Sequence, residues 1–202
     1  KEIDRLSFKQ QYLCGLCELA HIEDCIELWQ HLDENKTCLT EYLGLTREEH
    51  ETFLRQGRNA LGALLEPQRR KQRFVLYQLE LDEHKAIPFA FKGLAALRKA
   101  GYEQPPAAMY RIAGAGEVYC PVEQSDAEIL ERLFADCREE LPEGCHGRPM
   151  ALSDVVELDY AQKRLYYYVD DKDKFSLVKF SPMLAQKDTA GGNERGFHGG
   201  CK

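Results

Sequence analysis

The sequence predicts an α+β protein: a helical N-terminal domain followed by a mostly antiparallel sheet packed by two helices. Three observations predict this class, namely a helical apolar period up to residue 66, strand-like apolar runs after residue 74, and helical segments between those runs. We expect a helical domain over 1–66, a basic linker over 67–73, an α+β domain over 74–183 and a flexible, glycine-rich tail over 184–202.

The first domain is expected to consist of several helices. Its opening apolar residues recur at helical spacing: Phe8, Tyr12, Leu13, Leu16, Leu19. The pattern continues after a break near His21. A short helix over 39–45 ends at Gly44, a residue suited to a left-handed C-terminal cap. Thr46 and Glu49 have the spacing of a capping box, so the next helix should begin there.

The second domain begins with a strand. Phe74 to Leu81 carries apolar residues on both alternating faces, which is typical of a strand buried on two sides. We expect a helix over 88–100 and a second helix over 124–139, which Ser125 and Glu128 open as a capping box. Together these helices should cover one sheet face. The remaining strands are predicted at 109–112, 118–122, 155–158, 164–169 and 175–180, with Gly114 and Gly116 separating the first two.

The distribution of charge along the chain limits the classes of function that the sequence supports. The 202 residues carry a net charge of −7, with 7 basic and 13 acidic side chains in residues 1–66 and four basic ones in 67–73. A general nucleic-acid binder needs a broad basic face to displace counterions, and this chain is acidic on both sides of one short basic stretch. An acidic surface suits a basic protein partner.

Location and cysteine chemistry follow from composition. The longest apolar runs, such as 61–65, are far shorter than the roughly 20 residues of a membrane span. A chain of this size has no need of a disulfide framework, so the eight cysteines are expected as reduced thiols in a cytoplasm. We expect no membrane association, and the sequence leaves the oligomeric state open.

Three segments carry a family resemblance. Val75–Leu79 reads VLYQL, Leu152–Leu158 reads LSDVVEL, and Tyr166–Asp170 reads YYYVD. Together they resemble the YodL-like family over residues 73–181, small proteins often found among conjugative-element and prophage cargo in gut Firmicutes. The resemblance implies no catalytic residues. The genetic neighbourhood that it implies suggests inhibition of a host system such as a CRISPR nuclease or a restriction enzyme.

The N-terminal cysteines have two interpretations. Cys14, Cys17, His21 and Cys25 offer zinc-ligand chemistry, yet steps of 3, 4 and 4 on one continuous helix would instead form a buried stripe, which is the favoured interpretation. Cys14 and Cys17 as a redox pair would need a preceding strand and a helix N-terminus, and the sequence predicts neither.

Other candidate groups are also weighed against structural roles. Cys145 and His146 could be a nucleophile and base, but neighbouring residues rarely have the required orientation and no third partner is evident. Ser153 and Asp154 could bind a ligand, although both favour turns that launch a strand. Residues 37–58 could form a DNA-reading helix-turn-helix, but the second helix begins with three carboxylates that repel phosphates.

The leading hypothesis is a non-enzymatic protein-binding accessory protein of a mobile element. Its specific form is an anti-CRISPR or anti-restriction inhibitor that engages a basic nuclease through an acidic surface. We expect no cofactor and no metal. The residues expected to contact a partner are Arg148, Ser153, Asp154, Tyr166, Tyr168 and Asp170. The alternative is a nucleic-acid-binding regulator using the helical domain and Arg69, Arg70 and Lys71. A third hypothesis is an enzyme that uses Cys145 or Asp154.

Overall fold

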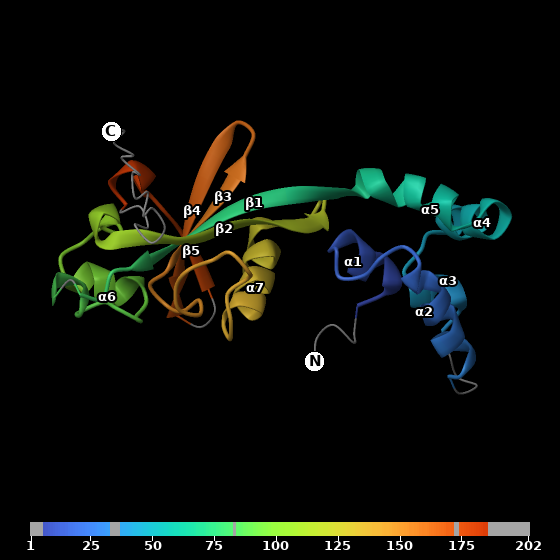
Figure 1. The fold of residues 1–202 in the computed structure, drawn as a ribbon, viewed down its shortest axis with the longest axis horizontal. Helices are drawn as coiled ribbons and strands as arrows, with labels where there is room; N and C mark the ends of the chain where they lie inside the picture. Colours follow the sequence, from blue (N-terminus) through green and yellow to red (C-terminus); the bar gives the residue numbers. More distant parts are fainter. Residues whose placement is uncertain (1–5, 33–36, 83, 172–173, 186–202) are drawn as a thin grey trace, which may run out of the picture. The chain divides into compact units, whose positions relative to one another are not determined.

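The computed structural model of the chain describes residues 6–32, 37–82, 84–171 and 174–185. They divide into two compact units, one drawn from Lys1–Phe74 with Gly116–Ile129 and the other from Val75–Ala115 with Leu130–Lys202. N-terminal helices precede a five-stranded antiparallel sheet with interspersed helices (Figure 1). The predicted α+β class is therefore confirmed.

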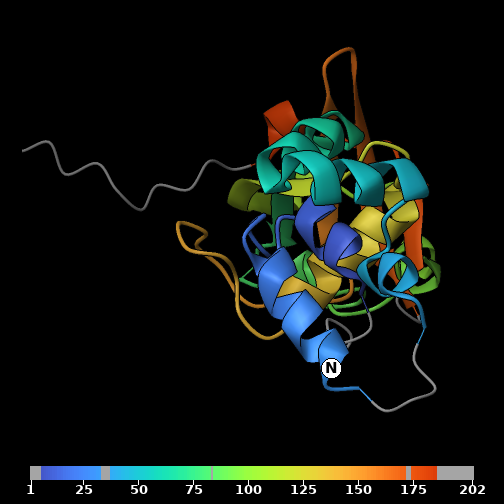
Figure 2. The same ribbon diagram turned by 90° about the vertical axis from the view of Figure 1, so that its right-hand side faces the viewer.

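The first unit contains most of the helices. Their bounds are α1 Phe8–Leu13, α2 His21–Gln30, α3 Leu39–Leu43, α4 Arg47–Gln56 and α5 Arg58–Leu65, and a 3₁₀ turn spans Glu66–Gln68. In Figure 2 these helices face the viewer. They enclose one apolar core, in which Phe8, Ile22, Leu43 and Leu61 are almost fully buried. Burial of these side chains supplies the main driving force for packing such short helices.

Caps fix the helix ends as the sequence predicts. Gly44 ends α3 with φ 71°, a left-handed conformation that favours glycine. The Thr46 side chain accepts the Glu49 amide, and Glu49 accepts the Thr46 amide in return. The Glu49 side chain is buried and also accepts from Lys9 at 2.8 Å and from Gln68 at 2.7 Å. Burial raises the pKa of Glu49, but these hydrogen bonds outweigh burial and hold it below its usual range.

The sheet has the strand order β2-β1-β3-β4-β5. Its bounds are β1 Arg69–Leu79, β2 Tyr110–Pro121, β3 Val155–Tyr160, β4 Lys163–Asp170 and β5 Lys174–Val178. Two helices accompany it, α6 Leu94–Lys99 and α7 Asp126–Cys137. Strands β3, β4 and β5 form an antiparallel meander in which Tyr168 lies between Val155 and Ser176.

The two helices pack against opposite faces of the sheet, so the expectation that they share a face is wrong. Leu94 and Leu97 of α6 lie in one core with Tyr168 of β4. Phe134 of α7 instead contacts Phe175 of β5, with ring centroids 6.3 Å apart. Phe175 pairs across to Val169, the neighbour of Tyr168, and neighbouring strand residues face opposite ways.

The segment expected to be a basic linker is a 3₁₀ turn followed by the first half of β1. Lys71 and Arg73 are exposed, whereas Gln72 and Phe74 between and after them are buried. This alternation of exposed and buried residues is typical of a strand with one exposed face. The four basic side chains of this segment hid the pattern in the sequence. The expected strand at 74–81 is therefore longer at its start.

Two further elements differ from expectation. The strands expected at 109–112 and 118–122 are one continuous strand, β2. Glycine is needed within it because a Cβ at Gly114 would overlap the Cys145 Sγ, and one at Gly116 would lie 2.9 Å from the Phe74 ring. The helix expected over 88–100 is limited to α6, because Phe91 has φ 57° and interrupts a helical path.

Among the residues that the structure describes, no helix has the length and apolar character needed to cross a bilayer. Most of the tail expected over 184–202 lies outside those residues. Of its first two residues, Leu184 ends a 3₁₀ turn over Pro182–Leu184, and Ala185 follows that turn.

Candidate functional site

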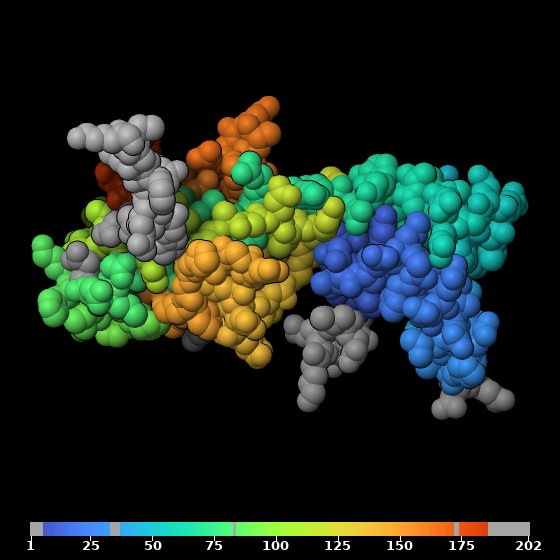
Figure 3. All heavy atoms as spheres, viewed as in Figure 1, coloured from blue at the N-terminus to red at the C-terminus, as the bar shows by residue number. Residues whose placement is uncertain are grey.

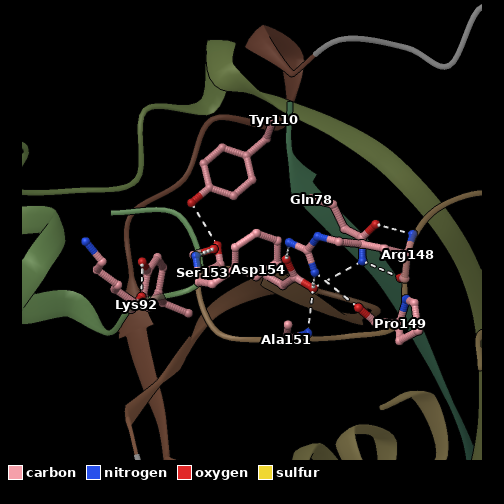
Figure 4. A network of polar contacts seen from close by, with 10 residues as sticks. Gln78, Lys92, Tyr110, Arg148, Pro149, Ala151, Ser153 and Asp154 are labelled. Carbon is pink, nitrogen blue, oxygen red and sulfur yellow. Dashed lines mark hydrogen bonds and ion pairs between the residues drawn. The ribbon is translucent and has the colours of Figure 1, made fainter. Parts of the chain in front are cut away.

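The turn before β3 carries a dense network of polar contacts, and its centre is Asp154 (Figure 4). The Asp154 side chain has no solvent exposure. Its carboxylate accepts both terminal nitrogens of the Arg148 guanidinium, one of them at 3.0 Å. It also accepts the Gln78 amide at 3.1 Å and the Ala151 backbone N–H at 3.0 Å. The charged group is thus fully partnered within the protein.

Two opposing effects set the ionisation of Asp154. Burial raises the pKa of this carboxyl to about 6, because a charged group is poorly solvated inside the protein. The Arg148 ion pair and the amide donors act in the opposite direction. The result is a carboxylate that is ionised at neutral pH and depends on Arg148 to remain so.

Gln78 is the residue that holds the turn against β1. Its side-chain amide donates to the Arg148 carbonyl at 2.8 Å, and its Oε1 accepts the Arg148 N–H at 3.1 Å. Only 1% of Gln78 is exposed. The sequence contained a signal for this role, since Gln78 is the one polar residue among the apolar ones of the VLYQL strand.

Ser153 adopts a strained backbone conformation, with φ 74°. Three hydrogen bonds hold it there. Its N–H donates to the Val169 carbonyl at 3.0 Å, its carbonyl accepts the Tyr110 hydroxyl at 2.9 Å, and its Oγ accepts the Phe91 N–H at 3.1 Å. Phe91 in turn places its ring 4.5 Å from the Arg148 guanidinium.

The structure brings Arg148, Ser153 and Asp154 together, but it buries them largely below the surface, where they are not available to a partner protein. Ser153 and Asp154 are fully buried, and 20% of the Arg148 side chain is exposed. Their hydrogen bonds serve the turn that launches β3, which agrees with the structural interpretation of the Ser-Asp pair.

The other three residues expected at a partner surface lie along β4. Tyr168 is buried and its hydroxyl donates to the Lys92 carbonyl at 2.9 Å. Tyr166 is half-buried, with its ring 5.6 Å from that of Phe180. The six residues therefore do not form one continuous exposed surface.

Asp170 caps α6 from a distant part of the sequence. Its carboxylate accepts the Leu94 N–H at 2.8 Å, the Asp171 N–H at 2.8 Å and the Ser176 hydroxyl at 2.8 Å. Partial burial raises the pKa of Asp170, but these hydrogen bonds outweigh it and leave the pKa below its usual range. The carboxylate therefore stays charged and fixes the start of α6.

A shallow cleft of about 370 Å³ lies beside this cap. Its lining residues are Leu94, Ala95, Arg98, Asp170, Asp171, Lys174 and Ser176. Two carboxylates and two cations balance one another there. The cleft offers polar groups of both signs without a nucleophile and base in contact.

The cysteine and histidine group of the first unit is dispersed. Helix α1 ends at Leu13 and α2 begins at His21, so the expected stripe on one continuous helix does not form. Cys25 is buried in the helical core and Cys17 packs against it. Within the described ranges, no three His, Cys, Asp or Glu side chains are grouped as metal ligands would be.

Cys17 also lacks the ionisation that redox chemistry needs. Burial, with a smaller contribution from Cys25, raises the pKa of the Cys17 thiol to about 11. A thiol with this pKa is protonated at neutral pH, whereas redox and metal chemistry use the thiolate. In the second unit, Cys145 is half-buried against Gly114, and the His146 side chain is exposed.

The helix-turn-helix candidate is present as α3 and α4. The Arg47 side chain is paired with Glu51 at 2.9 Å, and Glu48 is exposed in the first turn of α4. A DNA-reading helix places its N-terminal residues against base edges and phosphates, where exposed carboxylates are unfavourable. The charge argument made from the sequence therefore applies to the observed helix.

The fold, with a buried aspartate that fastens the turn before β3, defines the second unit as an α+β domain with helices on both sides of an antiparallel sheet. The chain belongs to the YodL-like domain family, whose model matches residues 73–180. This agrees with the resemblance over 73–181. No curated protein and no solved structure matched the chain.

Proposed function

We propose that this protein is a non-enzymatic accessory protein of a mobile genetic element that acts by binding another protein. The supporting observation is an exposed acidic stretch along α7 and the loop that follows it. Between residues 131 and 143, five carboxylates are exposed: Glu131, Asp136, Glu139, Glu140, Glu143. The same stretch contains two arginines, so its net charge is −3. In Figure 3, α7 lies on the viewed face of the molecule.

The acidic stretch has a rigid support. Phe134 anchors α7 to the sheet through Phe175, and the Cys137 carbonyl accepts the Met150 N–H at 2.8 Å. Glu131 and Asp136 lie on α7 itself, and Glu139, Glu140 and Glu143 follow in the loop that begins at its anchored end. Such an array favours recognition by charge complementarity.

The partner that fits this array is a basic nuclease of a host defence system, either an RNA-guided nuclease or a restriction enzyme. These enzymes use positively charged channels for nucleic acid, and an acidic protein can occupy such a channel and exclude the substrate. The polar groups of the family motif at 152–154 serve the turn itself. The proposal therefore places binding on the charged surface, away from the motif.

Binding to a purified RNA-guided DNA nuclease and to a restriction endonuclease, measured by biolayer interferometry with a DNA-cleavage assay, tests the proposal. The triple variant Glu131→Lys, Glu139→Lys, Glu140→Lys should weaken binding at least about tenfold, equivalent to ~1.4 kcal/mol. The matched control is Glu18→Lys, Glu27→Lys, Glu48→Lys, since all three glutamates are exposed in the first unit. Each triple changes the net charge from −7 to −1, by three changes of +2.

Equal weakening by both triples would assign the effect to net charge alone and contradict a specific acidic face. Raising the salt concentration from about 0.05 M to about 0.5 M should weaken binding of the wild-type protein, because exposed charges are screened over a shorter distance. Salt-independent binding would remove the electrostatic mechanism.

A second candidate, a nucleic-acid-binding regulator, is favoured by one observation. Lys71 and Arg73 are exposed on one face of β1, and Lys71 lies 5.2 Å from the Tyr119 ring. Cations beside an aromatic ring can hold a nucleic-acid backbone. A gel shift with operator-sized DNA at physiological salt tests this candidate: wild-type binding that Lys71→Ala with Arg73→Ala abolishes would support it, and absence of a wild-type shift would reject it.

A further inference from the structure

The two edges of the sheet differ in how far other segments of the chain cover them. At the β2 edge, the His146 N–H donates to the Ala113 carbonyl at 2.6 Å, and Cys145 packs over Gly114. Strand β5 forms the other edge, and within the described residues it pairs with β4 alone. An uncovered strand edge offers unpaired backbone groups to another strand.

The register shows which backbone groups of β5 face outward. The Val169 N–H donates to the Asp154 carbonyl, and the Val169 carbonyl accepts the Ser153 N–H, so both groups of Val169 point towards β3. Adjacent residues of a strand direct these groups to opposite sides. The groups of Tyr168 therefore point towards β5, where its partner is Ser176.

It follows that Ser176 directs its backbone groups inward, and that Phe175 and Leu177 direct theirs to the free edge. Lys179 continues the alternation, and its outward N–H is already used, donating to the Gln104 side chain at 2.7 Å. The open edge is thus two donors and two acceptors long, and it belongs to Phe175 and Leu177.

The side chains along this edge are apolar where the backbone is open. Leu177 is 64% exposed and Phe175 is half-buried, and both lie on the α7 face. Lysines stand only at the ends, Lys174 and Lys179. Sheet edges are commonly protected by short strands, lysines, bulges or proline. β5 is a short strand of five residues with a lysine at its start, and it contains no bulge or proline where Phe175 and Leu177 expose their backbone groups.

We propose that β5 pairs with β5 of a second copy of this chain, antiparallel and with the two-fold axis at Ser176. In this register, Phe175 exchanges both backbone hydrogen bonds with Leu177 of the second copy. Leu177 does the same with Phe175 of the second copy, giving four bonds in all. The two sheets become one ten-stranded sheet, and each Phe175 side chain meets a Leu177 side chain.

The register of the edge allows a second copy of the chain to occupy it, and this is the occupant that we propose. A two-fold contact requires the same patch to complement itself. The pairing around Ser176 satisfies every outward group of Phe175 and Leu177. A two-fold axis at Phe175 would leave each Leu177 beyond the end of the other β5, and an axis at Leu177 would place Phe175 opposite Lys179, whose N–H is engaged.

Disulfide trapping tests the register. Residues facing each other in a non-hydrogen-bonded antiparallel pair have Cα atoms about 4.5 Å apart, which is within disulfide range. Ser176→Cys in the full chain should therefore give, under mild oxidation, a reducible species of twice 23.2 kDa. Lys174→Cys lies on the same face two residues away, opposite Val178 of the second copy, and should not exceed the wild-type background.

No covalent dimer of Ser176→Cys above that background would overturn the proposed register, as would equal cross-linking of Lys174→Cys. Analytical ultracentrifugation tests association without cross-linking. The wild-type mass should rise with concentration towards 46.4 kDa, twice 23.2 kDa. Leu177→Lys should remain at 23.2 kDa throughout.

Leu184→Lys is the matched control, since Leu184 is also 64% exposed but lies outside the edge. It should dimerise as the wild type does. Leu177→Pro removes an outward N–H without removing a bond to β4, and should also be monomeric with an unchanged circular dichroism spectrum. A wild-type protein of 23.2 kDa even at millimolar concentration would overturn the proposal. This inference is independent of the proposed nuclease binding.

Discussion

Phe91 and Ser153 are joined by a hydrogen bond from the Phe91 N–H to the Ser153 Oγ at 3.1 Å, and both have positive φ angles, 57° and 74°. Within the described ranges, all other positive φ angles belong to glycine. Each residue stabilises the unusual conformation of the other. The pair also positions the two sides of the Arg148–Asp154 ion pair, since Phe91 stacks on Arg148 and Ser153 precedes Asp154.

Replacing Ser153 separates the hydrogen bond from the backbone strain. Ser153→Ala loses the acceptor for the Phe91 N–H and should lower the free energy of unfolding by about 1–2 kcal/mol. Ser153→Gly loses the same acceptor but adopts φ 74° without strain, so it should be more stable than Ser153→Ala by about 1 kcal/mol. Urea denaturation measures both, and an alanine variant at least as stable as the glycine variant would contradict the strain.

Asp154 should give stability a specific pH dependence. Its pKa is about 6 in the folded protein, against 3.8 for the ordinary carboxyl. Between these values the folded protein binds more protons than the unfolded chain, so stability should fall as pH rises from about 4 to about 6, by on the order of 3 kcal/mol, and then level off. The difference between wild type and Asp154→Asn across that range measures this contribution.

Removing Arg148 should shift the pH range over which stability falls. In Arg148→Met, the ion pair that lowers the pKa of Asp154 is absent while burial remains, so the decline in stability should extend to higher pH than in the wild type. An unchanged window would show that Arg148 does not control the ionisation of Asp154.

Gln78 should be more important for stability than its position in an apolar strand suggests. Gln78→Leu leaves the Arg148 N–H and carbonyl without partners and removes one donor from Asp154, so we expect a loss of about 2–4 kcal/mol. Gln72→Leu is a comparison within β1, because Gln72 bonds to Arg70 and Arg73 of its own strand. It should cost clearly less in thermal denaturation, and an equal loss would argue against a special role of Gln78.

Arg69 should not be replaceable by lysine. Its guanidinium lies 4.5 Å from the rings of both Tyr12 and Tyr119 and donates to Glu66 at 2.7 Å. A lysine cannot reproduce planar stacking on two rings, so Arg69→Lys should lower stability by about 1–2 kcal/mol. Arg73→Lys, on the same face of β1 and exposed, should be within about 0.5 kcal/mol of the wild type in urea denaturation.

Local chemistry made several elements predictable. Thr46 and Glu49 form the expected capping box, and Ser125 and Glu128 form the second one. Gly44 ends α3 as expected. These signals act within four residues, so they could be identified without knowledge of distant segments or of the sheet topology.

The start of α6 could not be predicted, because its cap comes from another part of the chain. Pro88 marks a plausible helix start in the sequence, but the Leu94 N–H is satisfied by Asp170, 76 residues away. The conformation of Phe91 likewise depends on Ser153, 62 residues away. The periodicity of apolar residues reports only on neighbours in the sequence, so it cannot predict contacts between residues this far apart.

The candidate site was predicted in part. Ser153 and Asp154 were expected either as a ligand site or as a turn, and the hydrogen bonds place them in a turn. Gln78 and Tyr110, which complete that turn, were missed as members because their partners are remote. A polar residue in a strand buried on both faces is the signal that could have identified Gln78.

The opposite placement of α6 and α7 limits where the chain can tolerate change in length. Tyr168 faces the α6 core and Val169 faces away from it, while Asp170 must reach the Leu94 amide. One inserted residue within β4 would exchange these environments at once, moving a tyrosine, a valine and a helix cap to the wrong sides. An insertion at Ala161–Gln162, in the exposed β3–β4 turn, leaves every one of them in place. Natural length variation in this domain should therefore gather at that turn and spare the strand that follows it.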